Sequence, residues 1–184
     1  MTEPLPSVTA ILRDIGLDPD FSMVPEATLA QAQARGTAVH KAIEAIAYGY
    51  FEEAEAPAEI MPYLGAYRRF IKDSGYVASV SEVEVTNEVW RYRGHPDTVG
   101  LLGRMRGVLD WKTAATLHRR AVASQLSAYH AAWNAQHPTE PVQFASAIQL
   151  RKDGSYRVHE VDVTEGLPHF QAAVLVYYDK KEVS

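Results

Sequence analysis

The chain has 184 residues, of which 47% are hydrophobic and 22% are charged, and it contains no cysteine. This length and composition predict one globular domain over residues 1–184, and they exclude disulfides and cysteine-bound zinc or iron–sulfur clusters. The formal net charge of −5 excludes a general positive field, so a polyanionic partner would have to be held by local charges or metal ions.

No apolar run approaches the roughly 20 residues that a membrane-spanning helix needs. The first residues, MTEPLPSVTAILRD, lack both a basic start and a continuous apolar stretch, so we expect no secretory signal. We therefore expect a cytoplasmic protein without a membrane partner, and the absence of cysteine fits that compartment.

Hydrophobic periodicity predicts helices and strands in alternation along the chain. In chain order, the expected elements are a helix over 29–50, a helix over 62–73, a long strand over 76–90, a hairpin over 94–113, a helix over 117–136, two strands over 142–150 and 156–163, and a helix over 166–180. Gly36 is a point where the first helix could divide, and Lys152-Asp153-Gly154 is a turn signal. This order predicts an α/β fold with a central mixed sheet of about five strands flanked by helices.

The hairpin carries carboxylates where a strand that covers a core would be apolar. If Gly103 and Arg104 form a two-residue turn, the register places Asp97 directly opposite Asp110. Two opposed carboxylates repel each other. Protonation of one of them would relieve the repulsion, but a divalent cation is the better explanation, because hard oxygen ligands suit Mg²⁺.

The same register places Lys112 opposite His95, on the face that carries the two carboxylates. An ammonium group beside a bound cation can hold or activate an attacking water molecule. The argument depends on the turn, because a slip of one residue sends facing side chains to opposite sides. An Asp-x-Lys triplet by itself is usually surface decoration, as a second one at residues 179–181 illustrates.

Three further features add to the hairpin. Gly36 and His40 share one helix face, where the glycine leaves room for another group to approach closely. Glu82 lies on an alternating strand just before the hairpin. Gln125 and Tyr129 also share one helix face. An ordinary solvated surface would explain each feature on its own, so their value lies in the combination.

Taken in order, these features resemble the PD-(D/E)xK nuclease superfamily in its RecB-like branch, which includes phage-type and mitochondrial genome maintenance-type exonucleases. The matching segments are Gly36–His40, Glu82, Gly94–Asp97, Asp110–Lys112 and Gln125–Tyr129. Each motif is weak alone, but five in the same order with compatible spacing are fairly specific. The resemblance extends from about Val24 to the last helix and implies a restriction-endonuclease-like core.

The resemblance also implies a site for one or two Mg²⁺ or Mn²⁺ ions. Asp97, Asp110 and the backbone carbonyl of Trp111 would be metal ligands. His40 would be the extra ligand that this branch commonly adds. Lys112 would position or deprotonate the attacking water.

The acidic position near the metal would be Glu82, with Glu84 as its replacement if the strand register slips. His95 stands where the family commonly has a small or apolar residue, so a contact with metal or DNA stays open for it. Some relatives hold an iron–sulfur cluster through cysteines, and this chain has none.

The helix over residues 117–136 would contact the nucleic acid. By resemblance, Gln125 and Tyr129 would orient the site and approach the phosphate backbone. The basic cluster of His118, Arg119 and Arg120 lies near the start of this helix, where phosphate binding is favourable. An ordinary solvated helix end explains that cluster equally well.

The resemblance predicts a metal-dependent deoxyribonuclease that degrades DNA from its ends, 5′ to 3′, in phage or bacterial recombination and repair. Action from ends also suits a chain with little positive charge to hold internal duplex sites. The expected partners are single-stranded DNA or duplex ends, with a second copy of the chain or a recombination protein as further candidates.

Two other functions stay open from the sequence. One is a catalytically silent nucleic-acid-binding or assembly module on the same fold. The other is a hydrolase of another phosphoester, which would use the same carboxylates. A metal-dependent cleavage assay separates the first from a nuclease, and a comparison of DNA, RNA and nucleotide substrates separates the second.

Overall fold

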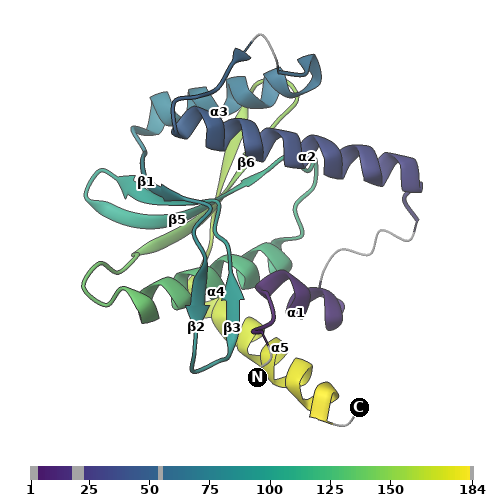
Figure 1. Cartoon of the computed structure of the whole chain (residues 1–184), viewed down its shortest axis with the longest axis vertical. Coiled ribbons are helices and arrows are strands. Elements are labelled where there is room, and N and C mark those ends of the chain that lie inside the picture. Colours follow the sequence, from purple (N-terminus) through teal and green to yellow (C-terminus); the bar gives the residue numbers. More distant parts are fainter. Residues whose placement is uncertain (1–3, 18–22, 54–55, 183–184) are drawn as a thin grey trace.

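The centre of the protein is a five-stranded sheet, seen in a computed structural model that describes residues 4–17, 23–53 and 56–182 (Figure 1). The strands follow the spatial order β1-β4-β5-β6-β7. Their bounds are β1 (Val77–Ser81), β4 (Thr98–Leu102), β5 (Met105–Lys112), β6 (Phe144–Leu150) and β7 (Tyr156–Glu160). Strands β5 and β6 run parallel and the other neighbours run antiparallel, which confirms the predicted mixed sheet.

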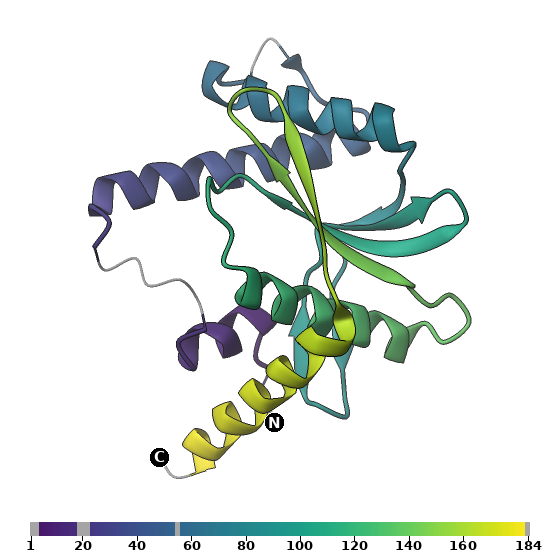
Figure 2. The same cartoon turned by 180° about the vertical axis from the view of Figure 1, so that it is seen from behind.

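Helices cover both faces of this sheet (Figures 1 and 2). They are α1 (Val8–Asp14), α2 (Glu26–Ala47), α3 (Met61–Ser74), α4 (Arg119–Gln136) and α5 (Val163–Glu182), with a 3-10 turn η2 (Ala58–Ile60) before α3. One buried cluster joins the sheet to α2 and α3, and another joins it to α1, α4 and α5. The arrangement is consistent with the restriction-endonuclease-like core expected from the sequence. Within the described residues, none of the helices combines the length and apolarity that a membrane crossing demands.

Strand β5 is buried on both faces, and its side chains alternate between the two helical layers. Leu109 and Trp111 belong to the cluster under α2 and α3, whereas Val108 belongs to the cluster under α4. Asp110 and Lys112, which have the same parity as Val108, therefore lie on the α4 side. The strand carries Asp110 into the interior, where only 3% of the residue is exposed.

The helix predicted over residues 29–50 forms as one continuous helix from Glu26 to Ala47, and Gly36 does not divide it. A glycine inside a helix costs only about 1 kcal/mol. Burial of Val39 and Ile43 against the neighbouring layer offsets that cost. The helices predicted over 62–73, 117–136 and 166–180 and the strands over 142–150 and 156–163 are also confirmed, with ends shifted by a few residues.

The long strand predicted over residues 76–90 is wrong, because the chain leaves the sheet after Ser81. Glu82 adopts a left-handed backbone conformation with a φ of 51°. The residues beyond it form β2 (Val85–Asn87), which pairs with β3 (Tyr92–Gly94) in a separate ribbon packed on α4. The side-chain alternation continues through the break, so it does not reveal that the pairing partner has changed.

The predicted turn at Gly103 and Arg104 is confirmed. Gly103 has a φ of 62°, which suits the first position of a tight hairpin turn. The facing pairs follow the predicted register as far as Thr98 and Leu109. The first arm is shorter than predicted, because β4 begins at Thr98 and Asp97 stands just before it.

Helix α1 is an element that the sequence analysis did not predict. Its first turn is capped by Ser7, whose hydroxyl oxygen accepts a hydrogen bond of 3.1 Å from the N–H of Ala10. Val8, Ile11 and Leu12 are buried in the cluster that contains α4 and α5. A helix of seven residues shows too few turns for its apolar spacing to stand out.

Candidate metal centre and its surroundings

Asp97 is held at three points just before β4. Its Oδ1 lies 3.2 Å from Nδ1 of His40 on α2. Its Oδ2 accepts a hydrogen bond of 2.6 Å from the backbone N–H of Trp111 on β5. Its backbone carbonyl accepts a hydrogen bond of 3.1 Å from the N–H of Glu82. One residue therefore ties together α2, β5 and the segment that follows β1.

His40, Glu82 and Asp97 together form an acidic pocket below α2. One ligand atom from each residue lies within 4.8 Å of the other two. The three line a small, partly open cavity of about 10 Å³, which is roughly the room that one water molecule or one ion needs. Carboxylates and imidazole are common ligands of Mn²⁺, and carboxylates are common ligands of Mg²⁺, so these three residues fit a divalent cation.

The backbone at Glu82 explains how its carboxylate reaches this pocket. A left-handed φ costs a non-glycine residue roughly 1–3 kcal/mol and persists only when the surroundings impose it. Here the hydrogen bond to Asp97 holds the turn on one side and the end of β1 holds it on the other. Strain of this kind commonly occurs at functional sites.

A second group of polar side chains, the lysine network, lies beside the acidic pocket on the α4 side of β5. The Lys112 Nζ is 2.7 Å from Oδ2 of Asp110, and it donates a hydrogen bond of 2.9 Å to Oε1 of Gln125. The Nε2 of Gln125 donates a hydrogen bond of 3.1 Å to the hydroxyl of Tyr129. Gln125 and Tyr129, four residues apart on α4, are thus joined by hydrogen bonds to Lys112 on β5.

Asp97 and Asp110, which were predicted to face each other across the hairpin, do not form a strand pair, because β4 begins after Asp97, and they have different partners. Asp97 contacts His40 and the Trp111 backbone, whereas Asp110 contacts the Lys112 ammonium. The carboxylate of Asp110 also lies outside the three-residue group that forms the acidic pocket. The structure therefore divides the predicted cluster into an acidic part and an electrically balanced part.

Two glycines in the predicted motifs have different roles. A Cβ added to Gly94 would lie 2.4 Å from Cε1 of Tyr129, so the Tyr129 ring packs directly on the backbone of Gly94. A Cβ added to Gly36 would lie 3.4 Å from the Thr113 hydroxyl, which is an ordinary contact. Gly94 is therefore required for packing, whereas Gly36 only brings α2 close to the end of β5.

The site is stabilised by added positive charge. Burial opposes a charged His40, but the hydrogen bond and charge of Asp97, together with the charge of Asp110, raise the pKa of His40 from 6.5 to about 9. Burial, and then the charge of Asp97, raises the pKa of Glu82. Burial also raises the pKa of Asp110, while the charge of Lys112 opposes that shift. Crowded, desolvated carboxylates attract either a proton or a metal cation.

Glu84 and His95 lie apart from the acidic pocket and pair with each other. Oε2 of Glu84 is 3.3 Å from Nε2 of His95 and 2.8 Å from Nη1 of Arg93. The predicted position of His95 opposite Lys112 is wrong, because the chain between β3 and β4 is not part of the hairpin. Glu82 rather than Glu84 is the acid beside His40 and Asp97.

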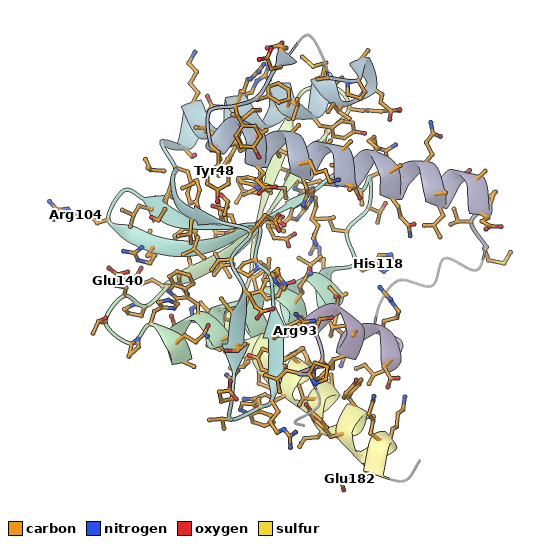
Figure 3. The ribbon with its side chains drawn as sticks, viewed as in Figure 1. Tyr48, Arg93, Arg104, His118, Glu140 and Glu182 are labelled. Atoms are coloured by element: carbon orange, nitrogen blue, oxygen red, sulfur yellow. The ribbon has the colours of Figure 1, made fainter. Side chains whose placement is uncertain are left out.

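The basic cluster at the start of α4 is divided between two sides of the helix. His118 lines a cavity of about 280 Å³ together with Lys112 and Gln125. Arg119 and Arg120 line a different cavity, of about 490 Å³, on the side of β7 and α5. Figure 3 shows His118 on the loop before α4. Of the three predicted contacts, only His118 adjoins the lysine network.

Sequence analysis missed one wall of the 280 Å³ cavity beside Lys112. Thr9 and Leu12 of α1 line it together with Leu117 and Val122. The capping serine before Val8 is a signal that predicts the start of a helix there. Nothing in the sequence pattern places that helix next to α4.

No protein-family model matches this sequence, and no curated protein matches it at a significant level. Three solved structures resemble the fold. SSO0001 is 14% identical, with 96% of this chain and 77% of that chain covered and a TM-score of 0.46. A candidate exonuclease from Eubacterium rectale is 13% identical, with 77% of this chain and 64% of that chain covered and a TM-score of 0.50. LHK-Exo in complex with dAMP is 14% identical, with 97% of this chain and 88% of that chain covered and a TM-score of 0.44.

The likeness to the Eubacterium rectale protein concerns the fold, because the two sequences share only 13% of their residues. The chain spans about two thirds of that protein, which therefore has further structure of its own. LHK-Exo is an alkaline exonuclease from Laribacter hongkongensis. LHK-Exo in complex with dAMP and SSO0001 superpose with lower TM-scores, so we draw no conclusion from them. The chemistry of the site is therefore argued from this chain's own residues.

Proposed function

We propose that this protein is a divalent-metal-dependent nuclease that hydrolyses DNA phosphodiester bonds. The observation that carries the proposal is the acidic pocket, where His40, Glu82 and Asp97 surround a cavity of one-ion size. Lys112, paired with Asp110, lies on β5 next to Trp111, whose backbone N–H bonds Asp97. The resemblance of the sequence motifs to the PD-(D/E)xK nucleases and the shared fold support the same conclusion.

In this proposal His40, Glu82 and Asp97 hold the cation, with Asp110 and the Trp111 carbonyl as further ligands. When bound, Mg²⁺ or Mn²⁺ supplies positive charge for the phosphate and for the leaving oxygen. Asp97 arrives with its second oxygen already engaged by the Trp111 N–H, so it has little freedom to rotate. A preorganised ligand loses little conformational entropy when the cation binds.

Lys112 would position the attacking water and stabilise negative charge on the phosphate. Asp110 and Gln125 fix its ammonium group from two directions. Tyr129 orients the Gln125 amide, because its hydroxyl takes the hydrogen bond from Nε2 and leaves Oε1 directed at Lys112. Tyr129 is only 4% exposed, so its role is to hold Gln125 in place. Contact with the phosphates would fall to exposed residues such as His118.

We also propose that the enzyme acts from DNA ends, with 5′ to 3′ polarity suggested by the resemblance alone, in recombination or repair. Two observations support action from ends. The net charge of −5 gives little attraction for long internal duplex sites. The basic cluster at the start of α4 is divided between two cavities, so it forms no continuous track for a duplex backbone.

The test compares one DNA molecule in linear and covalently closed circular form, with Mg²⁺ or Mn²⁺ and with the variant Asp97→Asn as the control. We expect the wild-type protein to degrade the linear form to nucleotides or short oligonucleotides and to spare the circle, while the variant cleaves neither. Equal initial rates on both forms would mean internal cleavage and overturn the end-directed part. Absence of any metal-dependent cleavage would overturn the nuclease and favour a silent binding module.

A further inference from the structure

Two tyrosines at the end of α2 are exposed side by side on the surface. Tyr48 is 59% exposed and Tyr50 is 63% exposed. Their rings are parallel within 8°, with centroids 6.3 Å apart. Gly49 between them has a φ of 77°, a left-handed conformation that glycine adopts without strain. Large aromatic side chains normally bury most of their surface, so an exposed parallel pair suggests a binding role.

Tyr48 lies next to the acidic pocket, and Tyr50 is connected to it through Tyr48. Tyr48 lines a shallow hollow of about 430 Å³ along β1, together with Ala47, Ala78 and Ser81. The last three residues also line the small cavity that contains His40, Glu82 and Asp97, so the two spaces adjoin. The Tyr48 hydroxyl donates a 3.5 Å hydrogen bond to the carbonyl of Ser81, the residue before Glu82. Figure 3 shows Tyr48 just below α2.

The chemistry of the hollow favours one kind of occupant. Its lining consists of alanine, serine, valine and tyrosine side chains, which offer apolar and aromatic surface rather than charge. Phosphates would not be attracted there, but the flat faces of bases would, since every base can stack on an aromatic ring. His40 and Tyr48 stand eight residues apart on the α2 path, which is roughly 12 Å along a helix. A strand held at the pocket could reach the tyrosines within a few nucleotides.

We propose that Tyr48 and Tyr50 form a stacking platform for unpaired bases of the DNA strand whose backbone occupies the acidic pocket. The inference rests on the proposed nuclease function and deepens it, because it names the group that is recognised beside the cleaved bond. Stacking needs an unpaired base, so the platform selects single-stranded or frayed ends over intact duplex. It recognises the π face of any base, so it confers no sequence preference.

The experiment measures binding of a short single-stranded oligonucleotide in the Asp110→Asn background with Mn²⁺, because this variant should not cleave and should retain more of the metal than Asp97→Asn does. We compare the unchanged platform with Tyr48→Ala/Tyr50→Ala, Tyr48→Leu/Tyr50→Leu and Tyr48→Phe/Tyr50→Phe. The alanine and leucine pairs should weaken binding at least about tenfold, the range of a lost stacking contact. The phenylalanine pair should stay within about twofold. Because both side chains are exposed, thermal melting should be unchanged in all variants.

A second probe carries abasic sites in place of the bases and keeps every phosphate. The unchanged platform should bind this probe as weakly as the alanine pair binds the normal strand. Equal affinity for abasic and normal strands would overturn the platform, as would wild-type affinity in the alanine pair. Retained affinity in the leucine pair would mean a plain apolar contact, such as one for a peptide along β1, and would also overturn it.

Failure of the platform and failure of the nuclease give different results. If the wild-type protein cleaves DNA and the alanine pair binds and cleaves with unchanged Kd, KM and kcat, only the platform is wrong. If the wild-type protein binds single strands through the tyrosines but cleaves nothing, the platform stands on a silent module. If the wild-type protein neither binds nor cleaves DNA, both proposals fall.

Discussion

The acidic pocket and the lysine network lie side by side around strand β5, yet their charges are arranged in opposite ways. In the lysine network the carboxylate of Asp110 already has an ammonium partner at 2.7 Å. In the acidic pocket the carboxylates of Glu82 and Asp97 lie close to His40. Burial opposes a charged His40, but Asp97 and Asp110 raise its pKa to about 9. One half is electrically complete and the other is stabilised by an added cation, so the two halves suit different tasks, positioning and metal binding.

The largest effects should come from removing either carboxylate charge. Asp97→Asn and Asp110→Asn should both abolish cleavage, but for different reasons. Asp97→Asn should also abolish tight Mn²⁺ binding, because it removes a ligand of the acidic pocket. Asp110→Asn should retain more of that binding and fail because Lys112 loses its ion pair. Calorimetric titration with Mn²⁺ measures the difference.

Glu84→Gln is the matched control for these carboxylate variants. The substitution removes an acid that is only two residues from Glu82. The Glu84 carboxylate pairs with Arg93 and His95 and does not contribute to the acidic pocket. The cleavage rate and Mn²⁺ affinity of this variant should equal those of the wild-type protein. A loss of activity as large as that of Asp97→Asn would place Glu84 in the site and contradict the division described above.

The next largest effect concerns Lys112 and His40, one from each half. Lys112→Ala should slow hydrolysis at least about a hundredfold, the usual range for a lost acid–base or positioning group, and should leave Mn²⁺ binding largely intact. His40→Ala should weaken Mn²⁺ binding first and lower the rate as a consequence. If His40→Ala binds Mn²⁺ like the wild-type protein, the histidine has a structural role and the acidic pocket lacks its nitrogen ligand.

A smaller effect on stability should separate the two motif glycines. Gly94→Ala should lower the free energy of unfolding by about 1–3 kcal/mol, because the new Cβ would overlap the buried Tyr129 ring. Gly36→Ala should be neutral or slightly stabilising, since the added methyl group has room and alanine favours helix. Urea denaturation monitored by tryptophan fluorescence gives both values. Equal destabilisation would mean that the contact between Gly94 and Tyr129 is not tight.

The smallest effect is the dependence of stability on pH in the metal-free protein. The pKa of His40 is raised from 6.5 to about 9 in the folded chain, so the folded state binds its proton more tightly than the unfolded state does. The resulting stabilisation is fully present below about pH 6.5 and is lost as the pH rises through 9. The melting temperature should therefore fall across this range in the wild-type protein. His40→Ala should show a flatter profile.

Mn²⁺ should change the same profile, because the cation needs the unprotonated imidazole. Its affinity should rise with pH up to about 9, the pKa of His40, and the melting temperature at saturating Mn²⁺ should then fall less steeply. An affinity that stays constant between pH 6.5 and 9 would mean that His40 does not coordinate the metal.

Much of the site could be predicted because hairpin register is a local property. Once a glycine turn is assigned at Gly103, the facing pairs follow, and the strands obey that register as far as Thr98 and Leu109. The register fails beyond that point, where the first arm has left the hairpin. Helical spacing is equally local, and it correctly relates Gln125 to Tyr129. These features depend on residues close in sequence, so composition and spacing are enough to predict them.

Other features depend on contacts between distant segments, and the sequence pattern was silent or misleading about them. The break at Glu82 exists because β2 pairs with β3 and packs on α4, although the alternation of side chains runs on unchanged. The short helix α1 forms because its apolar face is covered by α4 and α5. The division of the basic cluster follows from where β7 and α5 pack against the start of α4.

By itself, the sequence determined the α/β class, the hairpin register and the residues that could bind a metal, since turns and periodicity fix these over a few residues. Only the tertiary structure decided which acids share a pocket. In the folded chain His40 pairs with Asp97, Lys112 pairs with Asp110, and Glu84 pairs with His95 outside the pocket. The physical reason is that an ion pair or a metal pocket depends on separations of a few ångströms between atoms, and the packing of whole helices and strands sets those separations.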